Sequence, residues 1–146
     1  MRRAKTRNLK KRRNNMATTH ARRTTTKTTK EFDSPTILVN CMTPCSRCDA
    51  LRPLLNDSFI KYCGSLGYSL CINETNSKTT EYWKKYGKPR KVGQATPQMY
   101  AIDGSKAAGV SLVPGEVVGG YEIPATSKWN LTFVKKVTKL LVGNES

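Results

Sequence analysis

Three of the five cysteines in this 146-residue chain lie within eight positions, in the stretch Cys-Met-Thr-Pro-Cys-Ser-Arg-Cys at residues 41–48. Unpaired backbone N–H groups at a helix N-terminus, or a nearby cation, favour the thiolate, which is the form of cysteine that attacks disulfides. Cys45 stands where a strand-like run gives way to a helical pattern, and Arg47 adds a positive charge beside it. Cys48 follows about one helical turn later and can attack a mixed disulfide formed at Cys45. The spacing therefore predicts a two-cysteine redox couple.

Three other arrangements of these cysteines remain open. The Cys-x3-Cys-x2-Cys spacing matches the cluster-binding loop of radical S-adenosylmethionine enzymes, although those enzymes need a larger barrel than residues 34–146 supply. A zinc site would need a fourth ligand, and the chain has no second Cys-x2-Cys pair. The candidates for that ligand are Cys63, Cys71 and His20. Structural disulfides are disfavoured in a chain without a secretory signal. We therefore expect no bound metal and no bound cofactor.

A strand is expected to run into a helix through the cysteine cluster. The β-branched run at residues 36–42 predicts a buried strand, in which Cys41 would be a small buried hydrophobic residue. Residues 45–62 carry apolar side chains at three- and four-residue spacings, which predicts a helix. Pro53 lacks an N–H and clashes with the preceding turn, so it should kink this helix.

The rest of the pattern predicts three more strands and two more helices. The strands are residues 68–73, 98–102 and 116–121. The last two would form an antiparallel hairpin across a long loop at residues 105–115. The helices are residues 77–86 and a C-terminal helix capped by Ser127. The order is β-α-β-α-β-β-α, which indicates an α/β fold.

Positive charge is concentrated at the N-terminus. Residues 1–30 hold 12 of the 26 Lys and Arg residues and no acidic residue, which leaves 14 basic against 10 acidic residues in the remainder. This segment has few apolar residues and no regular period, so we expect a disordered or partner-bound arm at residues 1–33 and a domain at residues 34–146. Such arms bind polyanions by releasing counterions. The expected polyanion-binding residues are Arg2, Arg3, Lys10, Lys11, Arg12, Arg13, Arg22 and Arg23.

The partner of the arm would be nucleic acid or an acidic protein surface. A solvated tail and an organelle transit peptide are the alternatives, and residues 10–13 also suit a nuclear-import signal. No stretch approaches the ~18 apolar residues of a membrane span, and no apolar segment follows the basic start as it does in a secretory signal. We expect a protein that has no membrane span and is not secreted, located in the cytoplasm or a virion, with the nucleus or an organelle as alternatives.

Several of these features together resemble the thioredoxin superfamily, and one points to its glutaredoxin branch. They are the strand at residues 37–39, Cys45-Ser46-Arg47-Cys48, Pro53 five residues after the second cysteine, Thr96-Pro97 before the third strand, and Gly119-Gly120. The resemblance covers residues 34–142. It implies a thioredoxin-like fold with a mixed four-stranded sheet, in which Cys45 is the nucleophile and Cys48 the resolving thiol.

The resemblance also implies a substrate site. A cis peptide bond before Pro97 would turn the backbone of Thr96 toward Cys45, where it pairs with an extended peptide or with glutathione. Arg47 would add a charge for substrate. Gly119, Gly120 and Glu122 would help to hold glutathione, which is a candidate reductant. The alternative for the double glycine is a turn between a strand and a helix.

The chain departs from the family in two ways. Ser46-Arg47 stands between the cysteines, where thioredoxins have Gly-Pro and glutaredoxins have Pro-Tyr. The strand at residues 36–42 lacks the buried carboxylate that thioredoxins use for proton transfer beneath the cysteine pair.

Two functions are consistent with these features. The first is a thiol–disulfide oxidoreductase that acts on a disulfide-containing protein or on glutathione and is tethered by its arm to a polyanionic partner. The second is a structural thioredoxin-fold component of a virion, such as a minor capsid protein, or of another nucleic-acid-rich assembly, anchored by the same arm.

Overall fold

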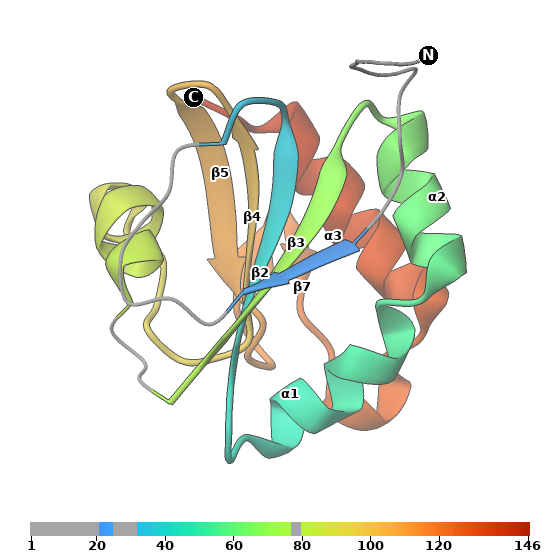
Figure 1. Cartoon of the computed structure of the whole chain (residues 1–146). Coiled ribbons are helices and arrows are strands. Elements are labelled where there is room, and N and C mark those ends of the chain that lie inside the picture. Colours follow the sequence, from blue (N-terminus) through green and yellow to red (C-terminus); the bar gives the residue numbers. More distant parts are fainter. Residues whose placement is uncertain (1–20, 25–31, 77–79) are drawn as a thin grey trace.

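The computed structural model describes residues 21–24, 32–76 and 80–146, which form an α/β structure around a mixed sheet (Figure 1). The sheet has the order β1-β3-β2-β4-β5. Its strands are β1 (Ala21–Thr24), β2 (Thr36–Met42), β3 (Ser69–Thr75), β4 (Gln98–Asp103) and β5 (Lys106–Ser111). Strands β1 and β2 run parallel to β3, whereas β4 runs antiparallel to β2 and to β5. Strands β6 (Val117–Val118) and β7 (Tyr121–Glu122) form a separate small hairpin.

Within the described residues, three α-helices cover one face of the sheet, and a short segment of π- and 3-10 helix covers the other (Figure 1). The helices of the first face are α1 (Ser46–Leu51), α2 (Asp57–Ser65) and α3 (Leu131–Gly143). The second face carries a π-helical turn, η3 (Trp83–Gly87), and a 3-10 turn, η4 (Lys88–Arg90). Alternate residues of β2 serve the two cores: Ile37, Val39 and Cys41 belong to the core under the helices, and Leu38 belongs to the core under η3. A strand buried on both faces reads as a continuous apolar run, which is why β2 was predicted with its correct bounds.

The helix expected at residues 45–62 is divided into three pieces. After α1 the chain forms a 3-10 turn, η2 (Arg52–Leu54), with Pro53 in its first positions. The side chain of Asn56 then caps α2 by accepting a hydrogen bond from the Phe59 N–H at 3.0 Å. Asparagine is among the strongest N-cap residues, so it starts a new helix where the sequence reading continued the old one. The interruption expected at Pro53 is therefore present, but a new helix follows it instead of the continuation of a kinked one.

The prediction that residues 116–121 form the strand paired with β4 was also wrong. That partner is β5, which follows a two-residue turn in which Gly104 has a φ of 65°. Strand β5 contains Ala107, Ala108 and Gly109 and lacks the β-branched pattern on which the prediction relied. Gly109 is required by packing, because a Cβ at this position would lie 2.3 Å from Cδ1 of Tyr100.

Two helix starts differ from the expectation. The C-terminal helix α3 is capped by Asn130, whose side chain accepts from the Phe133 N–H at 2.8 Å, and Ser127 lies in the preceding 3-10 turn, η5 (Thr126–Lys128). The helix expected at residues 77–86 differs at its end: η3 occupies Trp83–Gly87 and η4 continues over Lys88–Arg90, whereas residues 77–79 lie outside the described residues.

Buried amide side chains join three strands on the face under η3. Asn40 Nδ2 donates to Gln98 Oε1 at 3.0 Å and to Thr80 Oγ1 at 3.3 Å, and Asn73 Nδ2 donates to Asn40 Oδ1 at 3.1 Å. The Tyr100 hydroxyl donates to Gln98 Oε1 at 2.8 Å. In the part of the chain that the structure describes, Asn73 Oδ1 is the buried side-chain oxygen left without a partner.

The arm is not wholly separate from the sheet. Residues 21–24, which include Arg22 and Arg23, form β1 and pair in parallel with residues 70–73 of β3. The arm expected at residues 1–33 therefore contributes a fifth strand, and the disorder expected of it does not hold for Ala21–Thr24. Backbone pairing with an exposed sheet edge needs no apolar pattern, which explains why the composition gave no sign of it. Across the described residues, no helix combines the length and the apolar character needed to cross a membrane.

The pairing of β1 predicts two different effects of shortening the arm. Deleting residues 1–31 removes β1 and exposes the edge of β3, so we expect a loss of about 1 kcal/mol in the free energy of unfolding, or roughly 4 °C in Tm. Deleting residues 1–20 keeps β1 and should leave Tm unchanged. Thermal unfolding of the two truncated proteins and the full chain tests this. Equal Tm values for both truncations would show that β1 contributes no stability.

Candidate active site

The cysteine cluster lies where β2 ends and α1 begins. Cys45 is the N-cap residue of α1, with extended backbone (φ −162°, ψ 110°), and its Sγ accepts a hydrogen bond from the Cys48 N–H at 3.2 Å. The side chain therefore takes the place that Ser or Asp usually fills at a helix start. Cys45 is half-buried, whereas Cys41, Cys48, Cys63 and Cys71 are buried. The expectation that Cys45 is the accessible thiol is confirmed.

Cys48 lies beneath Cys45 in the core. Its side chain has no solvent exposure, and its Sγ accepts a hydrogen bond from the Met42 N–H at 3.3 Å. The last residue of β2 thus holds the second sulfur directly. Cys41, the preceding residue of β2, is equally buried in the same apolar cluster.

A second loop brings Thr96 and Pro97 to the first sulfur. The Thr96–Pro97 peptide bond is cis, as the resemblance implied, and the Thr43–Pro44 bond is cis as well. The Cys45 thiol donates to the Thr96 carbonyl oxygen at 3.6 Å, and Thr96 Oγ1 donates to Cys45 Sγ at 3.4 Å. The carbonyl and the hydroxyl of Thr96 therefore both face the sulfur of Cys45.

Arg47 reaches the same loop. Its Nε donates to the Thr96 carbonyl oxygen at 3.1 Å, so this oxygen accepts from Arg47 and from Cys45 at once. The resemblance implied that the Thr96 carbonyl would pair with a bound peptide. In this structure Arg47 already occupies it, and a peptide must share or displace that contact.

The two buried sulfurs at the end of β2 affect each other's protonation. The hydrogen bond to Cys48, together with burial, raises the pKa of Cys41 far above its usual range. The hydrogen bond from Cys41 lowers the pKa of Cys48 to about 6, against the opposite effect of burial, with further contributions from Cys45, the Met42 N–H and Thr96. The lowered pKa of the buried Cys48 was not expected from the sequence.

Arg52 ties the segments around the cluster together, and the sequence interpretation missed it. Nε donates to Glu74 Oε2 at 3.1 Å and Nη2 to Glu74 Oε1 at 2.9 Å, which forms a two-point ion pair with the end of β3. Nη2 also donates to the Met42 carbonyl at 3.1 Å, and Nη1 to Asp49 at 2.6 Å. The sequence held one signal for this ion pair. The parallel strands β2 and β3 have their carboxyl ends at the same end of the sheet, and Glu74 lies there.

The double glycine does not belong to this cluster. Gly119 and Gly120 are the two-residue turn between β6 and β7, with φ values of 54° and 79°, as a type I′ turn requires. Gly119 packs on the C-terminal part of α3, where an added Cβ would lie 3.0 Å from Leu140 Cδ2. The alternative, a turn between a strand and a helix, is also wrong, because the two glycines join two strands.

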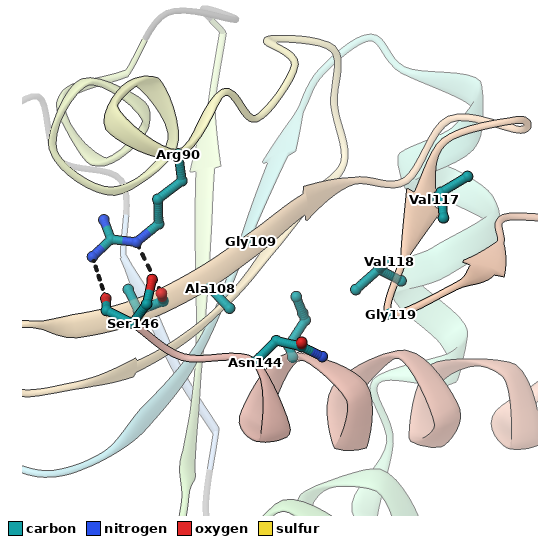
Figure 2. Close-up of a pocket in the computed structure, with 10 residues that line it drawn as sticks. Arg90, Ala108, Gly109, Val117, Val118, Gly119, Asn144 and Ser146 are labelled. Atoms are coloured by element: carbon teal, nitrogen blue, oxygen red, sulfur yellow. Dashed lines mark hydrogen bonds between the residues drawn. The ribbon is translucent and has the colours of Figure 1, made fainter.

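Gly119 instead lines a cavity of about 250 Å³, together with residues of β5 and the C-terminal segment (Figure 2). Arg90 crosses one side of the cavity and donates to the carbonyls of Ala107 and Ser146 at 2.8 and 3.0 Å. Ala107 pairs with Ile102, which pairs with Thr36 at the start of β2, whereas the cysteines follow the end of β2. The cavity wall formed by Ala107 and the cysteine pair therefore belong to opposite ends of the sheet.

The structure does not place Gly119 and Gly120 beside the cysteines, and the glutathione-binding role expected for Gly119, Gly120 and Glu122 stays a prediction. The sequence reading placed residues 116–121 in the main sheet next to β4, but β5 takes that position and moves these residues into a hairpin over α3. The structure brings together Cys45, Cys48, Arg47, Thr96 and Pro97. It adds Cys41, Met42 and Arg52 to them.

The expected polyanion-binding residues cannot be placed in the same way. Arg2, Arg3, Lys10, Lys11, Arg12 and Arg13 lie outside the described residues. Arg22 and Arg23 lie in β1 at the sheet edge. Within residues 21–24, 32–76 and 80–146, no three His, Cys, Asp or Glu side chains are arranged to hold a metal ion, and the five cysteines are free thiols.

Comparisons with known proteins add no assignment. No protein-family model matches the chain, and neither curated proteins nor solved structures gave a match.

The burial of the five thiols predicts the order in which they react. Iodoacetamide at neutral pH should modify Cys45 first in the reduced full-length protein, because the other four cysteines are at most 1% exposed. Peptide mass analysis of samples taken over time gives the order, and labelling in denaturant controls for the intrinsic reactivity of each peptide. Faster modification of Cys48 or Cys63 would contradict the exposure that the structure gives.

Proposed function

We propose that this protein is a thiol–disulfide oxidoreductase with a thioredoxin-like fold. The observation that carries the proposal is the half-buried Cys45, whose sulfur caps α1 and contacts the carbonyl and the hydroxyl of Thr96, with the buried Cys48 one helical turn away. The element order, the mixed sheet and the cis Thr96–Pro97 bond beside the thiol agree with the resemblance to the thioredoxin superfamily. These features support the fold assignment independently of the cysteine spacing.

The first half of the reaction takes place at Cys45. Its thiolate attacks one sulfur of a substrate disulfide, a new S–S bond forms to Cys45, and the other substrate sulfur leaves as a thiolate that takes a proton from water. Three donors can stabilise the Cys45 thiolate or the substrate next to it. These are the Cys48 N–H at 3.2 Å, Thr96 Oγ1 at 3.4 Å and the guanidinium of Arg47, which is held at the Thr96 carbonyl.

The second half uses Cys48. Its sulfur attacks Cys45 Sγ as a thiolate, the bond between Cys45 and the substrate breaks, and the second substrate sulfur leaves as a thiolate that takes a proton from water. The pair has then passed two electrons to the substrate and is itself a disulfide. A thiol such as glutathione can return the two electrons by the reverse exchange. Hydrogen bonds lower the pKa of Cys48, which favours the thiolate that this attack requires.

The basic arm would tether this activity to a polyanion. Residues 1–30 carry twelve positive charges and no acidic residue, and nucleic acid or an acidic protein surface is the complementary partner. Pairing of β1 with β3 would fix the base of the arm to the domain edge farthest from β5.

Substitution of each cysteine should separate the two half-reactions. Cys45→Ser should abolish reduction of insulin disulfides, and Cys48→Ser should accumulate a mixed disulfide with the substrate, because the resolving sulfur is missing. Turbidity of reduced insulin measures the first effect, and mass spectrometry of the intact protein measures the second.

The matched control is Cys71→Ala, which removes a buried thiol from the opposite face of the sheet and should keep full activity. Wild-type protein that reduces neither insulin nor a glutathione mixed disulfide would refute the oxidoreductase proposal. The structural role in a nucleic-acid-rich assembly would then be the better account of the chain.

The tethering part of the proposal has its own test. Affinity of the full chain for duplex DNA should fall steeply with salt, because each neutralised phosphate adds roughly −0.9 to the slope of log affinity against log salt, so six contacts give about −5. Deleting residues 1–20 should remove most of this slope and leave insulin reduction unchanged. An arm that binds one acidic protein surface would instead resist competition by random DNA.

A further inference from the structure

Arg47 places a positive charge at the Cys45 site that no carboxylate of the described residues balances. Its Nε donates to the Thr96 carbonyl oxygen at 3.1 Å, and its other guanidinium N–H groups make no hydrogen bond or ion pair within the part of the chain that the structure describes. Two carboxylates at the cluster, Asp49 and Glu74, pair with Arg52 instead, at 2.6 and 2.9 Å. Because Arg47 is only half-buried, part of its surface is accessible to a molecule that approaches the site.

The contact with Thr96 fixes where this positive charge lies. Arg47 Nε and Cys45 Sγ both contact the same carbonyl oxygen, at 3.1 and 3.6 Å, so the two groups can be no farther apart than these contacts laid end to end. The loop that carries this oxygen is itself held, because the Pro97 carbonyl accepts from the Leu112 N–H at 2.8 Å. A side chain that is anchored before a ligand arrives loses little freedom when it binds that ligand.

The free part of the guanidinium suits a carboxylate. With Nε engaged, the two terminal amino groups of Arg47 remain as a planar fork of N–H donors. This fork matches the two oxygens of a carboxylate, and such charge-assisted pairs are stronger than neutral hydrogen bonds. Consecutive Cα atoms are about 3.8 Å apart, so an acidic residue beside a substrate cysteine can reach Arg47 while the substrate sulfur lies at Cys45. A basic residue in the same place would be repelled.

We propose that Arg47 is a specificity-determining residue that selects disulfides flanked by an acidic residue. The inference rests on the proposed oxidoreductase function and names its substrate class, which is a disulfide in an acidic peptide segment. Arg47 exchanges no proton or electron with the substrate and acts only by binding its carboxylate.

The experiment measures the first half-reaction of the full chain with three activated disulfides. Each is a blocked tetrapeptide of sequence Gly-Cys-X-Gly, with Glu, Gln or Lys as X, whose cysteine is joined to 2-thiopyridine. The Cys45 thiolate attacks the peptide sulfur, a bond from Cys45 to the peptide forms, and the leaving thiolate takes a proton from water to give 2-thiopyridone, which absorbance follows. Salt at about 0.15 M limits the effect of distant charges, including those of the arm. The rate of each peptide with 2-mercaptoethanol corrects for its intrinsic reactivity.

The ratios between the three corrected rates report specificity, because a change in the reactivity of Cys45 itself cancels from them. The wild type should react about fivefold faster with the Glu peptide than with the Gln peptide, and slowest with the Lys peptide. Arg47→Gln should bring the three rates within about twofold of one another. Arg47→Lys keeps the charge without the fork and should retain a smaller preference. Arg47→Glu should reverse the order, so that the Lys peptide reacts fastest.

The matched control is Lys106→Glu, which reverses an exposed charge at the start of β5. Lys106 pairs with Asp103, at the end of the sheet opposite to the cysteines, and this variant should keep the wild-type order. Glutathione also carries carboxylates, so its activated disulfide is compared with that of its diethyl ester. Equal rates for those two would leave acidic peptides as the substrate.

Two results would count against different claims. Arg47 variants that change the rates of all three peptides by the same factor would show that Arg47 only holds the Thr96 loop, which overturns this inference and leaves the proposed function standing. Intact mass analysis of the wild type tests the function itself, because Cys48 should release the peptide from Cys45. A peptide that stays bound to the wild type would instead refute the oxidoreductase function.

Discussion

The guanidinium of Arg52 is the contact on which the geometry of the thiol cluster depends. It joins the end of β2 through the Met42 carbonyl, the end of β3 through both oxygens of Glu74, and α1 through Asp49. A two-point pair between Arg and a carboxylate fixes orientation as well as distance. Met42 contacts both groups: its carbonyl accepts a hydrogen bond from Arg52, and its N–H donates to Cys48 Sγ. The loop that carries Cys45 is thereby held at both of its ends.

The two sulfurs differ in their access to solvent. Cys45 is reached from solvent and faces Thr96, whereas Cys48 lies in the core with hydrogen-bond donors directed at it. Under the proposed function this division suits the two half-reactions, because the first needs access to a substrate and the second needs only a short intramolecular attack. Arg47 is half-buried, and its Nε donates a hydrogen bond to the Thr96 carbonyl, which the Cys45 thiol also contacts.

Patterns within one segment were predictable from the sequence, and those that depend on contacts between distant segments were not. Strand β2 and the placement of Cys45 at a helix start follow from local hydrophobicity, and both are present. Strand β5 was missed because it has alanines in place of β-branched residues and a glycine, Gly109, that packing against Tyr100 requires. Arg52 was missed because its partner, Glu74, is 22 residues away along the chain. The double glycine was misplaced as a direct result of the error at β5.

The buried amides under η3 also make the alignment of the strands difficult to change. Side chains alternate between the two faces of a sheet, so sliding β2 by one residue against β3 and β4 would turn Asn40 into the apolar core beneath the helices. Asn73 and Gln98 would lose their shared partner, and a buried amide without a partner costs about 1–3 kcal/mol. The same slide would carry Cys41 to the opposite face. Asn40 therefore disfavours a shifted strand alignment, and it keeps Cys41 on the face of the sheet that the helices cover.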